Sequence, residues 1–287
     1  RGGTIFQFGA PVIPAQNCPI RNCAIYEDNA FIPGLTKQLI TVSNASGLII
    51  SNNKFGIDFA VSNIFKMEGY LAIEATQAGN FVTIDSNIFV NKIKMIDVNG
   101  GDVHISKNIF GAVDTNKANN LLLPGFAIVS TNNSKLDVID NFFFGITNAA
   151  ISLAGSNSIQ LISKNRFYNN NIDLISAGGN GNPVLVNDNI ARDGKYFVYS
   201  QDNLDFYIER NNINNYDTVI YNLNEPGSKK IRYIDNRMTC INDKVVVMDP
   251  TKFPAHPVPI ILTVNRNQIT GSGLPNDSVV VYSNNRL

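Results

Sequence analysis

Apolar residues recur along this chain in a six-residue pattern. A β-branched or aromatic residue is followed by two variable residues, an asparagine, one variable residue and usually a bulky apolar residue. Nine copies carry the asparagines Asn53, Asn87, Asn108, Asn141, Asn165, Asn189, Asn211, Asn236 and Asn267, and a truncated tenth reaches Asn284. Most steps between them are 21 to 25 residues. A repeat of this length, built from short β-rich segments, predicts an all-β fold: a right-handed, single-stranded parallel β-helix of about ten coils.

The positions around each asparagine predict which side chains face the core. The residues three and five before it are apolar or aromatic, with Gln160 as the exception. Because side chains alternate along a strand, both positions share one face. Nine residues after the asparagine lies a second apolar column, formed by Ile96, Ala150, Leu174, Val198, Ile220 and Val245. We therefore expect a second strand there, with Ile151, Ile175 and Val246 facing outward beside Tyr199 and Tyr221.

The asparagine itself is expected at a bend between strands, because Asn tolerates the left-handed backbone region. Stacked coils would also let the amides bond to one another in a ladder. The residue before it alternates in charge from the third copy onward, as Lys107, Asp140, Lys164, Asp188, Arg210, Asp235 and Arg266. We interpret this column as an exposed structural charge ladder, and we exclude it from any catalytic set.

The repeat also divides the chain. Residues 41–287 are predicted to form the β-helix domain, as a fragment of a longer chain, and residues 1–40 an N-terminal cap or irregular opening coil. Coils with extra residues are expected to send out loops near 66–80, 111–125 and 249–259, and such loops are frequent binding sites.

Composition narrows the function. The 23 basic and 23 acidic residues give no net charge, which argues against a nucleic-acid partner. No apolar run approaches the ~20 residues that span a bilayer, so membrane insertion is not expected. Three cysteines form neither a disulfide scaffold nor a zinc motif, and we expect no metal and no cofactor.

Two surface patches are candidate sites. Asp102, His104 and Asp137 should lie on one outer face, with the carboxylates about 8 Å apart by strand geometry. Inverting glycosidases hold their two carboxyl groups at about this separation. An ordinary solvated contact between His104 and Asp137 is the alternative.

The second patch combines Tyr207, Glu209 and Arg232 with Tyr199 and Tyr221, which should stack on the neighbouring strand. Tyrosine rings suit sugar rings, and arginine suits an acidic sugar. A subunit interface is the alternative here. If neither patch is catalytic, the carboxylates expected to face the groove between subunits are the next to test, with Asp97 and Asp173 first.

The coils reading Asn-Ile-Phe, as at Asn87 and Asn108, and Ile162-Ser-Lys-Asn-Arg-Phe167 resemble the pectate-lyase-like β-helices, and among them the phage tailspikes. The resemblance covers residues 41–287. It implies a homotrimer in the extracellular virion tail that binds a bacterial surface polysaccharide. Its active sites would lie on one β-helix face or between subunits. No catalytic motif of the pectate lyases is present to be carried over.

Three functions remain open at this point. The first is a tailspike depolymerase, a hydrolase or lyase acting on capsule or O-antigen. The second is a secreted bacterial polysaccharide lyase or epimerase. The third is a non-enzymatic β-helical adhesin.

Overall fold

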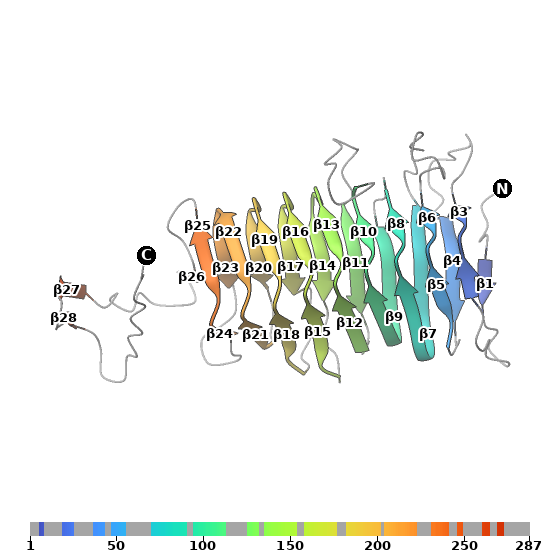
Figure 1. The fold of residues 1–287 in the computed structure, drawn as a ribbon. Helices are drawn as coiled ribbons and strands as arrows, with labels where there is room; N and C mark the ends of the chain where they lie inside the picture. Colours follow the sequence, from blue (N-terminus) through green and yellow to red (C-terminus); the bar gives the residue numbers. More distant parts are fainter. Residues whose placement is uncertain are drawn as a thin grey trace.

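The computed structural model describes residues 6–8, 19–25, 37–43, 47–55, 70–90, 94–112, 125–131, 135–153, 158–176, 182–201, 204–222, 231–240, 246–248, 260–264 and 269–272. Over these ranges the chain forms two parallel sheets, with strands that alternate between them in about ten coils (Figure 1). The predicted parallel β-helix is confirmed. Within the same ranges, no helix has the length and apolar character needed to cross a membrane.

The 17-stranded sheet contains two ribbons, and most described coils contribute one segment to each. We name the first set ribbon A: β1 (Phe6–Phe8), β4 (Lys37–Ser43), the first parts of β7 (Tyr70–Asp85) and β9 (Lys94–Ser106), β11 (Phe126–Thr131), β14 (Ala149–Leu153), β17 (Ile172–Ser176), β20 (Tyr196–Ser200), β23 (Thr218–Asn222) and β26 (Val246–Met248). Ribbon B comprises β2 (Pro19–Arg21), β5 (Ile49–Ser51), the last parts of β7 and β9, β12 (Lys135–Ile139), β15 (Gln160–Ser163), β18 (Val184–Asn187), β21 (Phe206–Glu209) and β24 (Ile231–Ile234).

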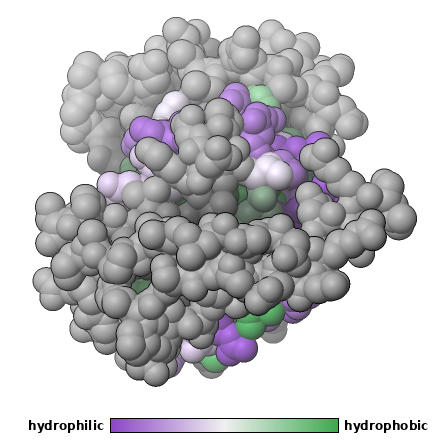
Figure 2. Space-filling model, turned by 90° about the vertical axis from the view of Figure 1, so that its left-hand side faces the viewer, coloured by the Kyte–Doolittle hydropathy of each residue, from purple (hydrophilic) through white to green (hydrophobic). Residues whose placement is uncertain are grey.

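The 9-stranded sheet is ribbon C, and it contains the residues that follow each key asparagine. Its strands are β3 (Ala24–Ile25), β6 (Lys54–Phe55), β8 (Ile88–Phe89), β10 (Ile109–Phe110), β13 (Phe142–Phe144), β16 (Arg166–Tyr168), β19 (Ile190–Arg192), β22 (Asn212–Tyr216) and β25 (Arg237–Cys240). Seen from one end of the solenoid, the described residues that reach the surface are mainly hydrophilic, and hydrophobic ones form small groups (Figure 2).

Apolar side chains fill the interior between the ribbons, in columns that follow the repeat. The position three before each asparagine is fully buried in Ile50, Ile84, Ile105, Val138, Ile162, Val186 and Ile208, as predicted. The position two after it holds Phe55, Phe89, Phe110, Phe143 and Phe167, whose rings stack 4.6–4.9 Å apart and within 8° of parallel. Offset-stacked rings add a specific attraction to the burial of their area. The repeat therefore produces a continuous aromatic stack along the axis.

The key asparagines form a buried ladder between ribbons B and C. Asn165 is typical: its Oδ1 accepts from the backbone N–H and the Nδ2 of Asn141, at 2.9 and 3.1 Å. Its own Nδ2 donates to the carbonyl of Val138 at 2.8 Å and to Oδ1 of Asn189 at 3.1 Å. The same bonding runs without a gap from Asn53 to Asn236. The predicted amide ladder is confirmed.

The asparagine is not the residue that bends the backbone, and this part of the prediction is wrong. The left-handed residue is the one before it, with φ of 53–58° at Asn22, Asn52, Ser86, Lys107, Asp140, Lys164, Asp188, Arg210 and Asp235. The charge column therefore occupies the strained turn position, where a non-glycine side chain points to solvent. Arg210 binds Asp188 there through two bonds of 2.9 and 3.0 Å, and both side chains are exposed.

The solenoid contains one further copy of the repeat, which the asparagine pattern did not reveal. Residues 19–25 form β2 and β3, which pair in register with β5 and β6. Cys23 stands at the asparagine position, and its backbone N–H donates to Oδ1 of Asn53 at 2.9 Å. The repeat was recognised by its asparagine, so a copy with Cys at that position was missed. Cys has no amide group, so the ladder of side-chain amides ends at Asn53. The domain boundary at residue 40 stays a prediction.

Two other expectations need correction. Residues 70–80 belong to strand β7 and not to a loop. Most of the extra residues lengthen this strand, and the others lie in a register shift between Ala78 and Val82. The copy at Asn267 does not continue the parallel sheets: β27 (Ile260–Val264) and β28 (Ile269–Ser272) pair antiparallel with each other. The loops predicted at 111–125 and 249–259 lie mostly or wholly outside the described residues.

Replacing Asn165 with Asp tests the ladder. A carboxylate at this buried site cannot donate to the Val138 carbonyl, and it would face the Oδ1 of Asn189. We expect a loss of about 3–5 kcal/mol in the free energy of unfolding at pH 7, measured by urea denaturation. Asn169→Asp, the same change at an exposed turn, is the control and should cost much less. Equal losses in the two variants would contradict the ladder's structural role.

Candidate functional site

His104 and Asp137 lie side by side on the outer face of ribbon B. Strands β9 and β12 pair these two residues directly, and His104 Nδ1 is 3.9 Å from Asp137 Oδ2. The ring of Phe81 stacks on that of His104, with 6.2 Å between centroids. Phe81 sits at the register shift of β7 with a φ of 70°, and 49% of it is exposed. The two extra residues of β7 thus place an aromatic ring over the predicted patch.

Asp102 lies beside this pair, but it already has a partner. Lys135 Nζ is 3.1 Å from Asp102 Oδ2, and the two residues face each other in register. The hydrogen bond and the charge of Asp102 raise the pKa of the Lys135 ammonium, and the charge of Asp137 adds to this effect. The structure therefore places a cation next to both carboxylates, which the sequence analysis did not anticipate. The patch is a mixed network of two carboxylates, one lysine and one histidine.

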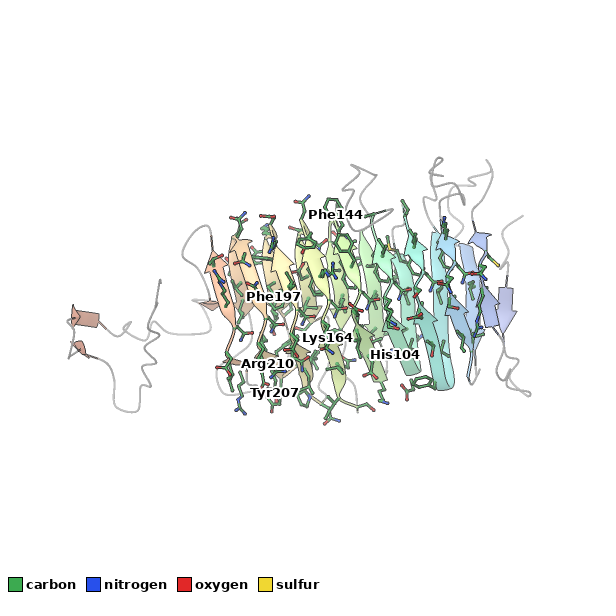
Figure 3. The ribbon with its side chains drawn as sticks, in the orientation of Figure 1. His104, Phe144, Lys164, Phe197, Tyr207 and Arg210 are labelled. Carbon is green, nitrogen blue, oxygen red and sulfur yellow. The ribbon has the colours of Figure 1, made fainter. Side chains whose placement is uncertain are left out.

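The second predicted patch is brought together only in part. Tyr207 and Arg232 are direct neighbours on β21 and β24. Glu209 Oε2 instead contacts Arg210 Nη1 at 3.3 Å, toward the turn that leads to ribbon C. In Figure 3, His104 and Tyr207 lie along the same edge of the solenoid, and Phe144 of β13 lies at the opposite edge.

Three tyrosines form an aromatic platform on the outer face of ribbon A. Tyr199 and Tyr221 stack as predicted, with centroids 5.2 Å apart and rings 3° from parallel. Tyr196 joins them at 5.2 Å from Tyr199 and 5.4 Å from Tyr221. Lys195 Nζ lies 5.2 Å from the Tyr196 ring centroid. We call Tyr196, Tyr199 and Tyr221 the tyrosine platform.

Sequence reasoning missed Tyr196 because ribbon A does not alternate strictly. Phe197 and Val198 are both buried, so Tyr196 and Tyr199 both face outward. The same irregularity overturns part of the predicted outward column. Ile151 is fully buried and pairs with Leu174, and Val246 pairs with the buried Ile220.

Ile175, by contrast, pairs with Tyr199 and is partly exposed, as predicted. In the backbone register, Val247 and not Val246 is the partner of Tyr221. The signal that could have corrected the register is a pair of adjacent apolar residues in several ribbon A strands, such as Met95-Ile96, Phe197-Val198 and Val219-Ile220.

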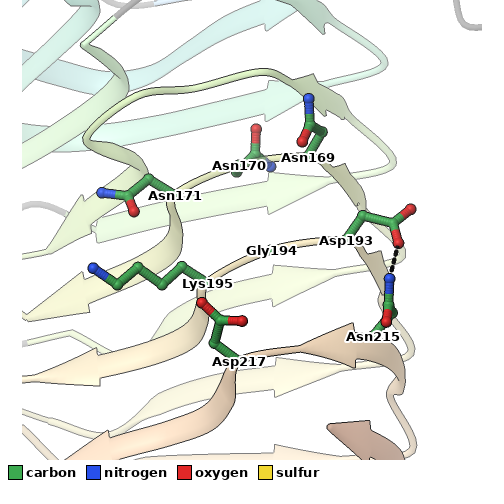
Figure 4. A pocket seen from close by; sticks show the side chains of 8 residues that line it. All are labelled: Asn169, Asn170, Asn171, Asp193, Gly194, Lys195, Asn215 and Asp217. Atoms are coloured by element: carbon green, nitrogen blue, oxygen red, sulfur yellow. Dashed lines mark hydrogen bonds between the residues drawn. The ribbon is translucent and has the colours of Figure 1, made fainter. Parts of the chain in front are cut away.

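A polar pocket opens beside the platform, where ribbon C turns into ribbon A. It has a volume of about 360 Å³ and is lined by three successive turns: Asn169, Asn170, Asn171, Asp193, Gly194, Lys195, Asn215 and Asp217 (Figure 4). Asp193 Oδ1 accepts from Asn215 Nδ2 at 2.5 Å. Lys195 belongs both to this pocket and to the platform. Polar groups in a pocket and aromatic rings beside it therefore form one continuous surface.

A buried polar cluster lies under this pocket. Asp173 is fully buried and accepts from Tyr216 Oη and from Asn170 Nδ2, the latter at 3.0 Å. Gly194 leaves the room for Tyr216, because a Cβ there would lie 2.2 Å from its Cε1. Asp173 was predicted to be accessible in a groove, and this is wrong: in the ribbon A register it aligns with Ala150 and Phe197 inside the core. Asp97, the other reserve carboxylate, binds Lys94 at 2.8 Å.

Burial raises the pKa of Asp173 to about 8, although its two hydrogen bonds oppose the shift. The folded protein thus keeps a proton that the unfolded chain releases near pH 4. Its stability should fall as pH rises through this window, by about 1.4 kcal/mol per pH unit from this group. Asp173→Asn should remove that slope, as measured by urea unfolding at pH 5, 6 and 7. Asp188→Asn is the exposed control and should keep it; equal slopes in wild type and Asp173→Asn would refute the assignment.

No family model matches the chain, and no curated protein sequence is significantly similar to it. Among the described residues, no group of three or more His, Cys, Asp or Glu side chains is placed to hold a metal ion.

Proposed function

We propose that this chain is the polysaccharide-binding β-helix of a phage tailspike, located in the virion tail. It would act as a homotrimer on a bacterial capsule or O-antigen. The observation that carries the proposal is the tyrosine platform beside the polar pocket. Stacked rings match the apolar faces of sugars, and amide and carboxylate groups match their hydroxyls.

The solenoid supports this role because it presents side chains as a rigid grid. Neighbouring coils repeat at about 4.8 Å, and the amide ladder and aromatic stack fix their register. A long polymer can therefore contact several coils at once without ordering a flexible loop. Polysaccharides are suited to such a surface because they also repeat along their length.

Cleavage would use carboxylates on the outer face of ribbon B. Glycosidic hydrolysis needs one protonated and one ionised carboxyl group near the same bond. Asp137 is the first candidate because its neighbour His104 can exchange a proton and Phe81 can support a sugar ring. Asp102 is ion-paired with Lys135 and would accompany Asp137 at the same site. Glu209, with Tyr207 and Arg232 binding substrate, is the rival centre.

Replacing Tyr199 and Tyr221 together with Ala tests the binding surface. We expect affinity for the cognate polysaccharide to fall at least about tenfold, which corresponds to about 1.4 kcal/mol, because the sugar would lose its stacking partners. Affinity electrophoresis against a panel of capsular and O-antigen polysaccharides measures it. Light scattering on the same samples is the control. If the variant binds normally but loses a trimeric mass, the tyrosines are a subunit contact.

Asp137→Asn tests the catalytic assignment. Turnover of a bound polysaccharide should fall by about 10²–10⁴-fold, because the general acid or base is lost while folding and binding remain. Reducing-end release and ultraviolet absorbance of unsaturated sugars distinguish hydrolysis from elimination. Glu209→Gln is the parallel variant for the rival centre. If wild type binds the polysaccharide but releases no product, the chain is an adhesin and neither patch is catalytic.

A further inference from the structure

Ribbon C differs from the rest of the solenoid in its charge. None of its strands contains Asp or Glu, whereas Lys54, Arg166, Arg192 and Arg237 all belong to it. The acidic residues within the described strands all lie in ribbons A and B, including Asp97, Asp102, Asp137 and Glu209. A chain without net charge has thus placed its strand carboxylates on one sheet and a group of arginines on the other.

The arginines lie close together on the outer face of four successive strands. Strand pairing puts Arg166 beside Phe142 and Arg192 beside Tyr168. Three rungs separate Arg166 from Arg237 in the same column, a span of about 14 Å at the usual strand spacing. All three arginines are exposed. We call Arg166, Arg192 and Arg237 the arginine face.

Aromatic and amide side chains lie beside these cations. The Phe142 ring is 5.4 Å from that of Tyr168 and 6.4 Å from that of Phe144. Asn212 and Asn214 occupy the next strand, and Asn214 Nδ2 donates to Asn212 Oδ1 at 2.8 Å. The face therefore combines charge, ring surfaces and hydrogen-bonding groups.

No carboxylate of the described chain is ion-paired with any member of the arginine face. Two of the acidic residues at its borders have other partners: Asp188 binds Arg210, and Asp193 accepts from Asn215. Arg210, by contrast, is an exposed arginine that does have a carboxylate partner, Asp188. Within the part of the chain that the structure describes, the three guanidinium groups of the arginine face have no carboxylate partner and could bind an external anion.

We propose that the arginine face binds an anionic polysaccharide through its carboxylate, phosphate or sulfate groups. The inference rests on the proposed function for the ligand being a polysaccharide, and it adds that the ligand is acidic. Guanidinium groups form bidentate bonds with such anions, and the neighbouring rings can stack on sugars. The face lies in the other sheet from the tyrosine platform, so it forms a second contact surface.

The charge density favours a polysaccharide over a nucleic acid. Duplex DNA presents a charge about every 1.7 Å along its axis, and its binders neutralise many phosphates with a basic surplus. Here three arginines span about 14 Å, and acidic turn residues such as Asp140, Asp188 and Asp193 border the face. A polymer with widely spaced charges fits this arrangement, and a dense polyanion would meet the bordering carboxylates.

The test compares two variants that each lose two positive charges. Arg166→Gln with Arg192→Gln removes the centre of the arginine face. Lys94→Gln with Lys107→Gln removes the same charge from β9 and from the turn that follows it. Affinity electrophoresis uses polygalacturonate as the acidic probe, dextran as the neutral probe and oligo-dT as the nucleic-acid probe. We expect the arginine variant to bind polygalacturonate at least tenfold more weakly than wild type, and the lysine variant less than twofold more weakly.

Three results would overturn the proposal. The first is equal binding of polygalacturonate by the arginine variant and wild type, or no binding by either. The second is tighter binding of oligo-dT than of polygalacturonate. The third is a change of molecular mass in the arginine variant, which would identify the face as a contact between copies. If wild type binds a neutral polysaccharide through the tyrosine platform but ignores polygalacturonate, this inference fails while the proposed function stands.

Discussion

The structure depends on the buried ladder of asparagine amides. Each amide replaces a backbone partner that the sharp turn between ribbons B and C cannot supply, and it passes the same bonding on to the next coil. Buried polar groups are costly unless every donor and acceptor is satisfied, so one misplaced coil would leave several unsatisfied atoms. The ladder therefore fixes the register of the solenoid as well as its stability. The phenylalanine stack two residues further on can form because this register is exact to the residue.

Because this register is fixed, the position of a residue within the repeat determines where its side chain reaches the surface. Residues at equal distances from the ladder form columns, and each ribbon carries its own columns to solvent. Ribbon B carries carboxylates and a histidine, ribbon A carries the tyrosine platform, and ribbon C carries arginines beside aromatic rings. A solenoid can therefore place different side-chain chemistry on different faces without additional domains. The polar pocket lies at the corner where ribbons C and A meet.

The buried cluster around Asp173 shows where the repeat departs from its own rule. Ala191 replaces the phenylalanine of the stack, and Phe197 from ribbon A packs edge-on against Phe167 in its place. Tyr216 follows, reaches Asp173 and depends on the missing side chain of Gly194. Polar contacts therefore constrain the shape of the core beneath the pocket. Burial in this core raises the pKa of Asp173 to about 8, so the folded state favours its protonated form.

The sequence by itself determined the parallel β-helix, the amide ladder, the inward columns of ribbon B and the stacking of Tyr199 on Tyr221. These follow from a strict period, because a coil that repeats in length must place equivalent residues above one another. Only the tertiary structure decided which residue takes the left-handed turn, that Asp102 pairs with Lys135, and that Ile151 faces inward while Tyr196 faces outward. Those features depend on bulges, doubled inward residues and side-chain contacts between coils. Such details break the period locally, so spacing counted along the chain cannot resolve them.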